Sequence, residues 1–209
     1  MEKIITEEML DALRVSLGEG MSPKRYKHTV EVERMAVRLG EIYLPEKLPE
    51  LRAAALLHDI TKEYNTERHL AICEKISIDI PREELLAPKT FHARTAAALI
   101  PTEYPELATD DVVSAVRWHT TGNGNMTLFE KLIYLADYID MSRSFEDCVA
   151  LRNYFFDFDF EGANEEQKLA HLRETLIKSY DYTIRGLLDD GKHINDTTFE
   201  ARNFLILER

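Results

Sequence analysis

Residues that start and stop helices recur along almost the whole chain, and the segments between them carry apolar side chains at helical spacing. Ser22 and Pro23 combine an N-cap with a proline at the first helical position, which predicts a helix to about Tyr43. Thr127 and Glu130 form a capping box in front of the run LFEKLIYLADYID. Because no pair of strand-like runs with hairpin turn residues accompanies these signals, we predict an all-α fold.

The other predicted helices share an apolar face bounded by a cap, a proline or a glycine. They are Thr6 to Gly18, the segment ELRAAALLHDI opened by Pro49, about Glu67 to Glu74, FHARTAAALI ended by Pro101, DDVVSAVRWH capped by Thr109, and two patterns on either side of Asp190-Gly191. The turn residues at 122–125 must break the chain. The aromatic stretch YFFDFDF at 154–160 alternates too briefly for a strand, so we expect an apolar loop or helix edge packed on the core.

Composition narrows the class of protein. The 209 residues are 44% hydrophobic and 31% charged, which is typical of one compact globular domain. A net charge of −12 argues against nucleic acid as a partner. The N-terminal segment has no signal-peptide pattern and no stretch is long enough to span a bilayer, so we expect a cytoplasmic protein without membrane contact. Cys73 and Cys148 indicate neither a disulfide framework nor a thiolate zinc site.

The strongest chemical signal is the pair His58-Asp59 at the end of an otherwise apolar helix. A buried carboxylate requires a metal, a cation or several hydrogen-bond donors. His28 and Asp137 lie in two further helical patterns, and together the four side chains make a nitrogen and oxygen set suited to a divalent ion such as Fe, Mn, Co, Ni or Zn. Each histidine alone is more often a hydrogen-bonded core residue, but their joint occurrence favours a metal site.

Several cationic and polar residues surround this set in the sequence. Arg25 lies in the first turn of its helix, where a cation is locally unfavourable, which supports a role in binding an anionic ligand. Lys62 follows Asp59 by one helical turn and can meet phosphate charge, although a solvated surface lysine is the simpler alternative. Thr120 and its two neighbours follow His119 where the chain turns, and could cradle a phosphate or simply form a turn. Tyr134 and Asp140 flank Asp137 by about one helical turn each; they could support the metal ligands or contact a nucleoside.

These residues resemble a known family. The order His28, His58-Asp59, Asp137 is similar to the H…HD…D signature of the HD superfamily of helical, metal-dependent phosphohydrolases. The segments RYKH at 25–28, LLHDITK at 56–62, WHTTG at 118–122, LIYLADYID at 132–140 with Arg143, and HINDTTFEARNFLI at 193–206 resemble the YqeK-type HD family. That family hydrolyses diadenosine tetraphosphate symmetrically to two ADP. Two segments depart from it: Phe91-His92-Ala93 stands where the family has His-Gly, and 140–143 stands where it has Glu-Pro-polar-Arg.

The resemblance implies an HD-domain helical bundle with extra terminal helices, in which 1–20 form an N-terminal helix, 21–143 the HD core, and 144–209 helices that complete the same domain. It implies iron, as one or two ions, at His28, His58, Asp59 and Asp137. It implies catalytic roles for Asp59, His92 and His119, and contacts to the substrate from Arg25, Asp59, Ile60, Thr61, Lys62, His92, His119, Thr120, Asp137 and Arg143. The chemistry expected is attack by a metal-activated hydroxide on the phosphate chain.

Several alternatives stay open. His92 and His119 could ligate a second metal bridged by Asp59, or only donate hydrogen bonds to phosphate. The same ligands serve HD proteins that cleave other phosphate esters, so a nucleotide phosphatase or phosphodiesterase is a second hypothesis. A non-catalytic nucleotide-sensing HD module is a third hypothesis. Metal identity, base preference and oligomeric state are not fixed by the sequence, and a homodimer is one option.

Overall fold

The computed structural model describes residues 3–81 and 84–208. Within these ranges the chain forms ten α-helices, three short 3-10 helices and no strand, which confirms the all-α prediction. The α-helices are α1 (Glu7–Gly20), α2 (Pro23–Tyr43), α3 (Leu48–Leu57), α4 (Thr66–Lys75), α5 (Phe91–Glu103), α6 (Asp110–Trp118), α7 (Leu128–Ile139), α8 (Glu146–Phe156), α9 (Glu165–Asp189) and α10 (Asp196–Leu207). The 3-10 helices are η1 (Pro45–Lys47), η2 (Glu84–Leu86) and η3 (Pro88–Thr90).

Capping side chains fix where the helices begin. The Ser22 hydroxyl accepts the Arg25 N–H at the start of α2, and Thr109 does the same for Val112 at the start of α6. Thr127 and Glu130 form the predicted capping box of α7. These starts match the sequence prediction because each cap is a local interaction between near neighbours.

One helix end was predicted wrongly, and one helix was missed. Helix α5 continues through Pro101 to Glu103, because a proline in the last turn removes only one hydrogen bond and the Tyr104 N–H still closes the helix on Ile100. Helix α8 was not predicted. The aromatic stretch at 154–160 supplies its last residues and the following turn, and Phe155 is fully buried, so its packing on the core is confirmed.

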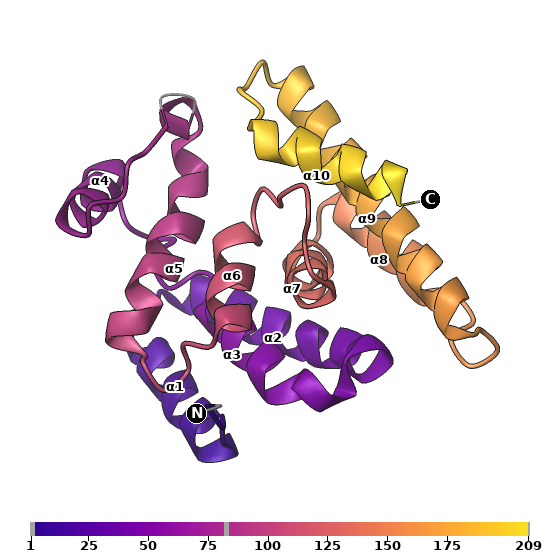
Figure 1. Ribbon diagram of the computed structural model, residues 1–209, viewed down its shortest axis with the longest axis horizontal. Helices are drawn as coiled ribbons and strands as arrows, with labels where there is room; N and C mark the ends of the chain where they lie inside the picture. The colour runs from indigo at the N-terminus through magenta and orange to yellow at the C-terminus, as the bar shows by residue number, and fades with distance from the viewer. Residues whose placement is uncertain (1–2, 82–83, 209) are drawn as a thin grey trace.

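The helices pack around one continuous cluster of buried apolar side chains that runs from Leu10 in α1 to Leu205 in α10. Helix α2 lies against α3 and α7, and α6 lies against α3, α5 and α7. Helices α8, α9 and α10 form the C-terminal side of the molecule, while α4 lies on the opposite side next to α5 (Figure 1). The consequence is that α2, α3, α5, α6 and α7 surround a common centre.

The turn after α6 depends on a glycine. Gly122 has a φ of +66°, and a β-carbon there would lie 2.0 Å from the Tyr180 hydroxyl of α9. Tyr180 is fully buried and stacks on Tyr134, with ring centroids 4.6 Å apart. The close approach holds the turn that follows His119 against α9.

In the described residues, none of the helices has the length and apolar character needed to cross a membrane.

Candidate metal centre and active site

Five side chains from four separate segments of the chain meet at the centre of the helices. His28 lies in α2, His58 and Asp59 directly follow α3, His119 directly follows α6, and Asp137 lies in the last turn of α7. His28 Nε2 is 3.1 Å from Asp137 Oδ1, and His58 Nε2 is 3.3 Å from Asp59 Oδ2. One ligand atom from each of His28, His58 and Asp137 lies within 4.8 Å of the others, and the same holds for His58, Asp59 and His119.

Three of the histidines are oriented in the same way. The Nδ1 atoms of His58, His92 and His119 lie 2.6, 2.8 and 2.7 Å from the carbonyl oxygens of the residues three positions earlier, at Ala55, Lys89 and Val116. A carbonyl only accepts, so each Nδ1 carries the ring proton and donates it. In the neutral ring each Nε2 therefore presents a lone pair to the centre, which is the arrangement that a metal ligand needs.

His28 is oriented by acidic and hydroxyl groups instead. Its Nδ1 lies 3.3 Å from Asp140 Oδ2 and 3.2 Å from Ser142 Oγ. Burial lowers the pKa of His28, but Asp137 and Asp140 outweigh burial and raise the pKa to about 9. Asp140 thus lies behind His28 as the flanking carboxylate that commonly supports a ligating histidine.

The donor atoms fit a divalent metal. His28 Nε2, His58 Nε2 and Asp59 Oδ1 are buried and have no hydrogen-bond partner among the described residues. Orphaned buried acceptors are rare because losing water without a replacement partner is costly. A cation among them would satisfy all three, and two imidazoles with two carboxylates suit a transition metal.

Asp59 faces two sets of partners with its two oxygens. Oδ2 lies near His28 and His58, whereas Oδ1 lies 3.3 Å from His92 Nε2 and 3.7 Å from His119 Nε2. Burial raises the pKa of Asp59, but the histidines and Lys62 around it outweigh burial and hold the pKa well below its usual range. The carboxylate is therefore ionised, and its two oxygens face two separate groups of histidines, each of which could hold a metal ion.

Cationic side chains cover the outer side of this cluster. Arg25 pairs with Asp59 Oδ2 and Arg143 pairs with Asp137 Oδ1, while Lys62 Nζ lies 3.8 Å from Asp59 Oδ1 and 3.0 Å from His92 Nε2. A cavity of about 440 Å³ opens beside them. Its described lining includes five lysine or arginine residues and no carboxylate: Lys24, Arg25, Lys27, His28, Lys62, Ser142, Arg143, Ser144 and Phe145. The mouth of the site is therefore locally positive in a chain with net charge −12.

The remaining predicted residues differ in what they present to the site. Thr120 Oγ1 lies 3.0 Å from both His92 Nε2 and His119 Nε2, inside the cluster. Thr61 is buried and donates to the His92 carbonyl, and Ile60 packs against the hydrophobic core, so neither side chain is directed at a ligand.

Packing and hydrogen bonding exclude the side-chain hydroxyl of Thr121, the N–H of Gly122 and the ring of Tyr134 as contacts for a ligand. Thr121 is buried and donates to the Gly122 carbonyl, and the Gly122 N–H bonds Trp118, so these two groups are not free to cradle a phosphate. Tyr134 is buried against Tyr180 on the side away from solvent, which removes it as a contact for a nucleoside.

Ser142 and Arg152 are among the residues at the site that were not found from the sequence. Ser142 contacts His28 and donates to Asp140 Oδ1. Arg152, in α8, donates to the carbonyl oxygens of Asp140 and Arg143, at 2.6 and 2.9 Å, and so holds the loop that carries Arg143. The only available signal for Arg152 was a charged residue within an apolar stretch, in a helix that was itself missed.

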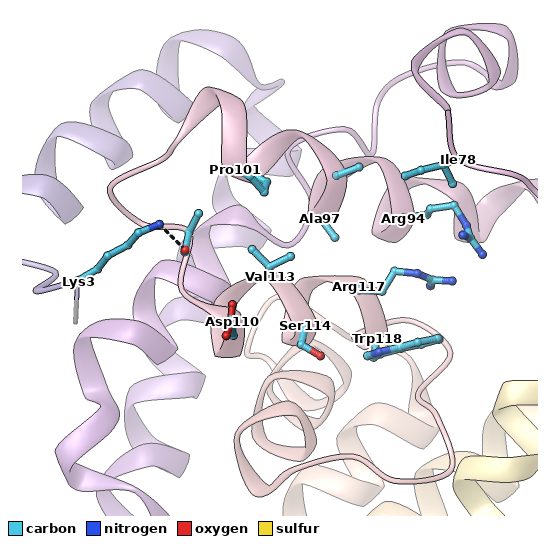
Figure 2. A pocket seen from close by; sticks show the side chains of 12 residues that line it. Lys3, Ile78, Arg94, Ala97, Pro101, Asp110, Val113, Ser114, Arg117 and Trp118 are labelled. Carbon is cyan, nitrogen blue, oxygen red and sulfur yellow. Dashed lines mark hydrogen bonds between the residues drawn. The ribbon is translucent and has the colours of Figure 1, made fainter. Parts of the chain in front are cut away.

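A second hollow lies away from the cluster. This pocket has a volume of about 600 Å³ and is lined by residues of α5 and α6 (Figure 2). Lys3 donates to the Ala108 carbonyl there, at 2.6 Å. Arg94 and Arg117 enter the pocket but share Glu84 as their counter-ion. None of the predicted site residues lines this pocket.

Comparison with known proteins agrees with this arrangement. The profile of the HD domain family matches residues 25–142, which contain all five residues of the cluster, and the chain belongs to this family. It is 31% identical to "Bis(5'-nucleosyl)-tetraphosphatase, symmetrical" of Bacillus subtilis over 96% of this chain and 97% of that protein. The protein of the same name from Halalkalibacterium halodurans is 31% identical over 90% of this chain and 92% of its own length.

A solved structure shares the fold. A predicted HD superfamily hydrolase involved in NAD metabolism from Clostridium acetobutylicum superimposes with a TM-score of 0.82 and 32% sequence identity, over 95% of this chain and 97% of that one. The similarity therefore extends beyond the HD core to the terminal helices.

Proposed function

We propose that this chain is a metal-dependent symmetrical bis(5'-nucleosyl)-tetraphosphatase that converts diadenosine tetraphosphate and water to two ADP. The observation that carries the proposal is that His28, His58, Asp59 and Asp137 meet beside a positive cavity, with buried ligand atoms of the first three that have no hydrogen-bond partner among the described residues. Relatives with that name match nearly the whole chain.

We also propose that the protein acts in the cytoplasm, and that residues 1–20, 21–143 and 144–209 form one domain.

We assign the divalent metal to His28, His58, Asp59 and Asp137, with iron as the proposed ion; Mn, Co, Ni and Zn suit the same donors. When bound, the metal supplies Lewis-acid chemistry: it activates water as a nucleophile and offsets charge on a phosphoryl oxygen. Asp140 and Ser142 hold His28 in the orientation that presents Nε2.

The cations of the chain position the substrate. Arg25 and Arg143 form ion pairs with the Asp59 and Asp137 carboxylates, and both arginines also line the cavity. Phosphate oxygens can take the place of those carboxylates, because a guanidinium binds either group through two parallel N–H donors. Lys62 reaches the same region between Asp59 and His92. These three side chains would stabilise the charge of the phosphate chain and orient it for attack.

His92 and His119 have two roles that fit their geometry. Burial lowers the pKa of both rings, and their Nδ1 protons are committed to carbonyl oxygens. As neutral rings they can ligate a second ion with Asp59 Oδ1, whereas donation to phosphate from Nε2 requires a protonated ring. Metal analysis of H92A and H119A distinguishes these roles: loss of one ion of two supports ligation, and unchanged content supports phosphate binding.

The test of the proposed function is a substrate comparison. Purified protein supplied with iron or manganese is assayed on diadenosine tetraphosphate, on NAD and on a simple phosphate monoester. We expect diadenosine tetraphosphate to be hydrolysed with the highest kcat/KM. Good turnover of the monoester without turnover of diadenosine tetraphosphate would contradict the proposal and favour a general HD nucleotide phosphatase.

A further inference from the structure

The cavity beside the metal cluster carries residues that the proposed chemistry does not use. Arg25, Lys62 and Arg143 lie next to the metal-ligating carboxylates, whereas Lys24 and Lys27 lie on the exposed side of the lining. Neither Lys24 nor Lys27 has an ion-pair partner within the part of the chain that the structure describes. The cavity therefore extends the positive surface outward, away from the reacting centre.

The helix that carries these lysines has cations at its N-terminal end, where the helix dipole favours negative charge. Helix α2 has no acidic residue in its first turn, where α1, α6, α8 and α9 each have two. Lys24, Arg25 and Lys27 occupy its first two turns, although cations at a helix N-terminus are electrostatically unfavourable. The Glu63 carboxylate accepts the Ser22 N–H at this end of the helix, and a bound polyanion would add further favourable charge beside the three cations.

Phe145 supplies an apolar surface at the same cavity. It is the N-cap residue of α8, and 67% of the residue is exposed to solvent. A single exposed phenylalanine is common in proteins and says little by itself. This one, however, lines a cavity that also contains His28 of the metal cluster and the lysines of α2. An exposed aromatic ring beside cations is the combination that binds a base and its phosphates together.

We propose that Phe145 stacks on one nucleobase of the dinucleoside tetraphosphate, while Lys24 and Lys27 neutralise the phosphates of the same half. This inference rests on the proposed function and adds to it a second nucleotide subsite. A substrate with two nucleosides and four phosphates extends past the reacting centre on both sides, and this cavity receives one of its halves. Contacts at this subsite would favour dinucleoside polyphosphates over mononucleotides, because a mononucleotide has no second half to bind there.

The experiment separates binding of the base from binding of the phosphate chain. The kcat/KM for diadenosine tetraphosphate is measured for F145A, F145W, K24A and K27A, together with the inhibition constant of inorganic tetraphosphate, which has no base. We expect F145A to lower kcat/KM about tenfold without changing inhibition by inorganic tetraphosphate, because base stacking alone is lost. F145W should keep the wild-type values. K24A and K27A should weaken both substrate use and inhibition, and more strongly at low salt.

Two exposed residues provide matched controls. Leu188, 63% exposed at the end of α9, and Lys75, at the end of α4, lie outside the cavity, so L188A and K75A should match the wild type. Unchanged kcat/KM in F145A, or equal losses for substrate and inorganic tetraphosphate, would overturn the inference while leaving the proposed function intact. A wild-type protein that does not hydrolyse diadenosine tetraphosphate would instead overturn the proposed function, and this inference with it.

Discussion

At the scale of single residues, Asp59 is the group on which the site depends most. One of its oxygens faces His28 and His58, and the other faces His92 and His119. The sequence alone indicated the four proposed ligands, because a buried carboxylate needs a partner and because several imidazoles and carboxylates occur together in apolar helices. It could not indicate Ser142, whose role depends on a loop brought to His28 from 114 residues away.

We predict that H58A and D59A each lose bound metal. Removing one ligand weakens the site and leaves the neighbouring buried donors unpaired. Elemental analysis of the purified variants measures this. R25A and R143A are the comparison: these cations would stabilise the charge of the phosphate chain and do not coordinate the metal, so their removal should lower catalysis and leave metal content unchanged. Full metal content and activity in H58A would contradict the assignment.

At the scale of elements, the helix starts were predictable and some helix ends were not. Caps such as Thr109 and Thr127 act between near neighbours, so their signal lies within a few residues. Helix α8 depends on packing against α7 and α9, whereas the exposed last residues of α5 continue the helix because Pro101 removes only one hydrogen bond. The interpretation of the aromatic stretch as an edge packed on the core was confirmed, although the helix leading into it was missed.

We predict that R152M disturbs the active-site loop through α8. The variant leaves the Asp140 and Arg143 carbonyl oxygens without their donor, which should lower the free energy of unfolding by about 2 kcal/mol. Because Arg143 then loses its fixed position, kcat/KM should fall roughly tenfold or more. Denaturant unfolding and steady-state kinetics measure the two effects, with R34M, on the exposed face of α2, as the control. Lost stability with unchanged kinetics would show that Arg152 does not position the loop.

We predict that G122A is strongly destabilising. The residue needs a positive φ, and its new β-carbon would meet the Tyr180 hydroxyl, so the free energy of unfolding should fall by roughly 3 kcal/mol. G186A is the matched control. Nothing lies within 4 Å of a β-carbon at Gly186 in α9, so alanine there should stabilise the protein by about 0.5–1 kcal/mol. Equal melting temperatures for the two variants would refute the packing argument.

At the scale of the whole molecule, one apolar cluster joins the terminal helices to the HD core. His171 of α9 lies inside the C-terminal part of this arrangement. It stacks on Phe158 at 4.2 Å, and its Nε2 lies 3.0 Å from the Phe155 carbonyl oxygen. Burial lowers the pKa of His171, because the charged ring is poorly hydrated among aromatic side chains.

We predict that stability falls on mild acidification. With the folded-state pKa below the unfolded value of about 6.5, the unfolded chain binds the proton more readily. The free energy of unfolding should therefore be independent of this group above about pH 6.5 and decrease as the pH falls below it. In H171Q this part of the pH dependence should disappear. Denaturant unfolding at a series of pH values measures it, and an unchanged slope in H171Q would contradict the assignment.

We predict that water attacks one of the two inner phosphorus atoms of diadenosine tetraphosphate and that the bridging bond at the middle of the phosphate chain breaks, so that ADP leaves. The most direct measurement runs the reaction in oxygen-18 water with the metal-loaded protein and identifies the primary products by mass. We expect two ADP molecules for each substrate consumed, with one oxygen-18 atom in one of them, because the bond broken lies at the middle of the phosphate chain. AMP and ATP as the primary products would contradict it.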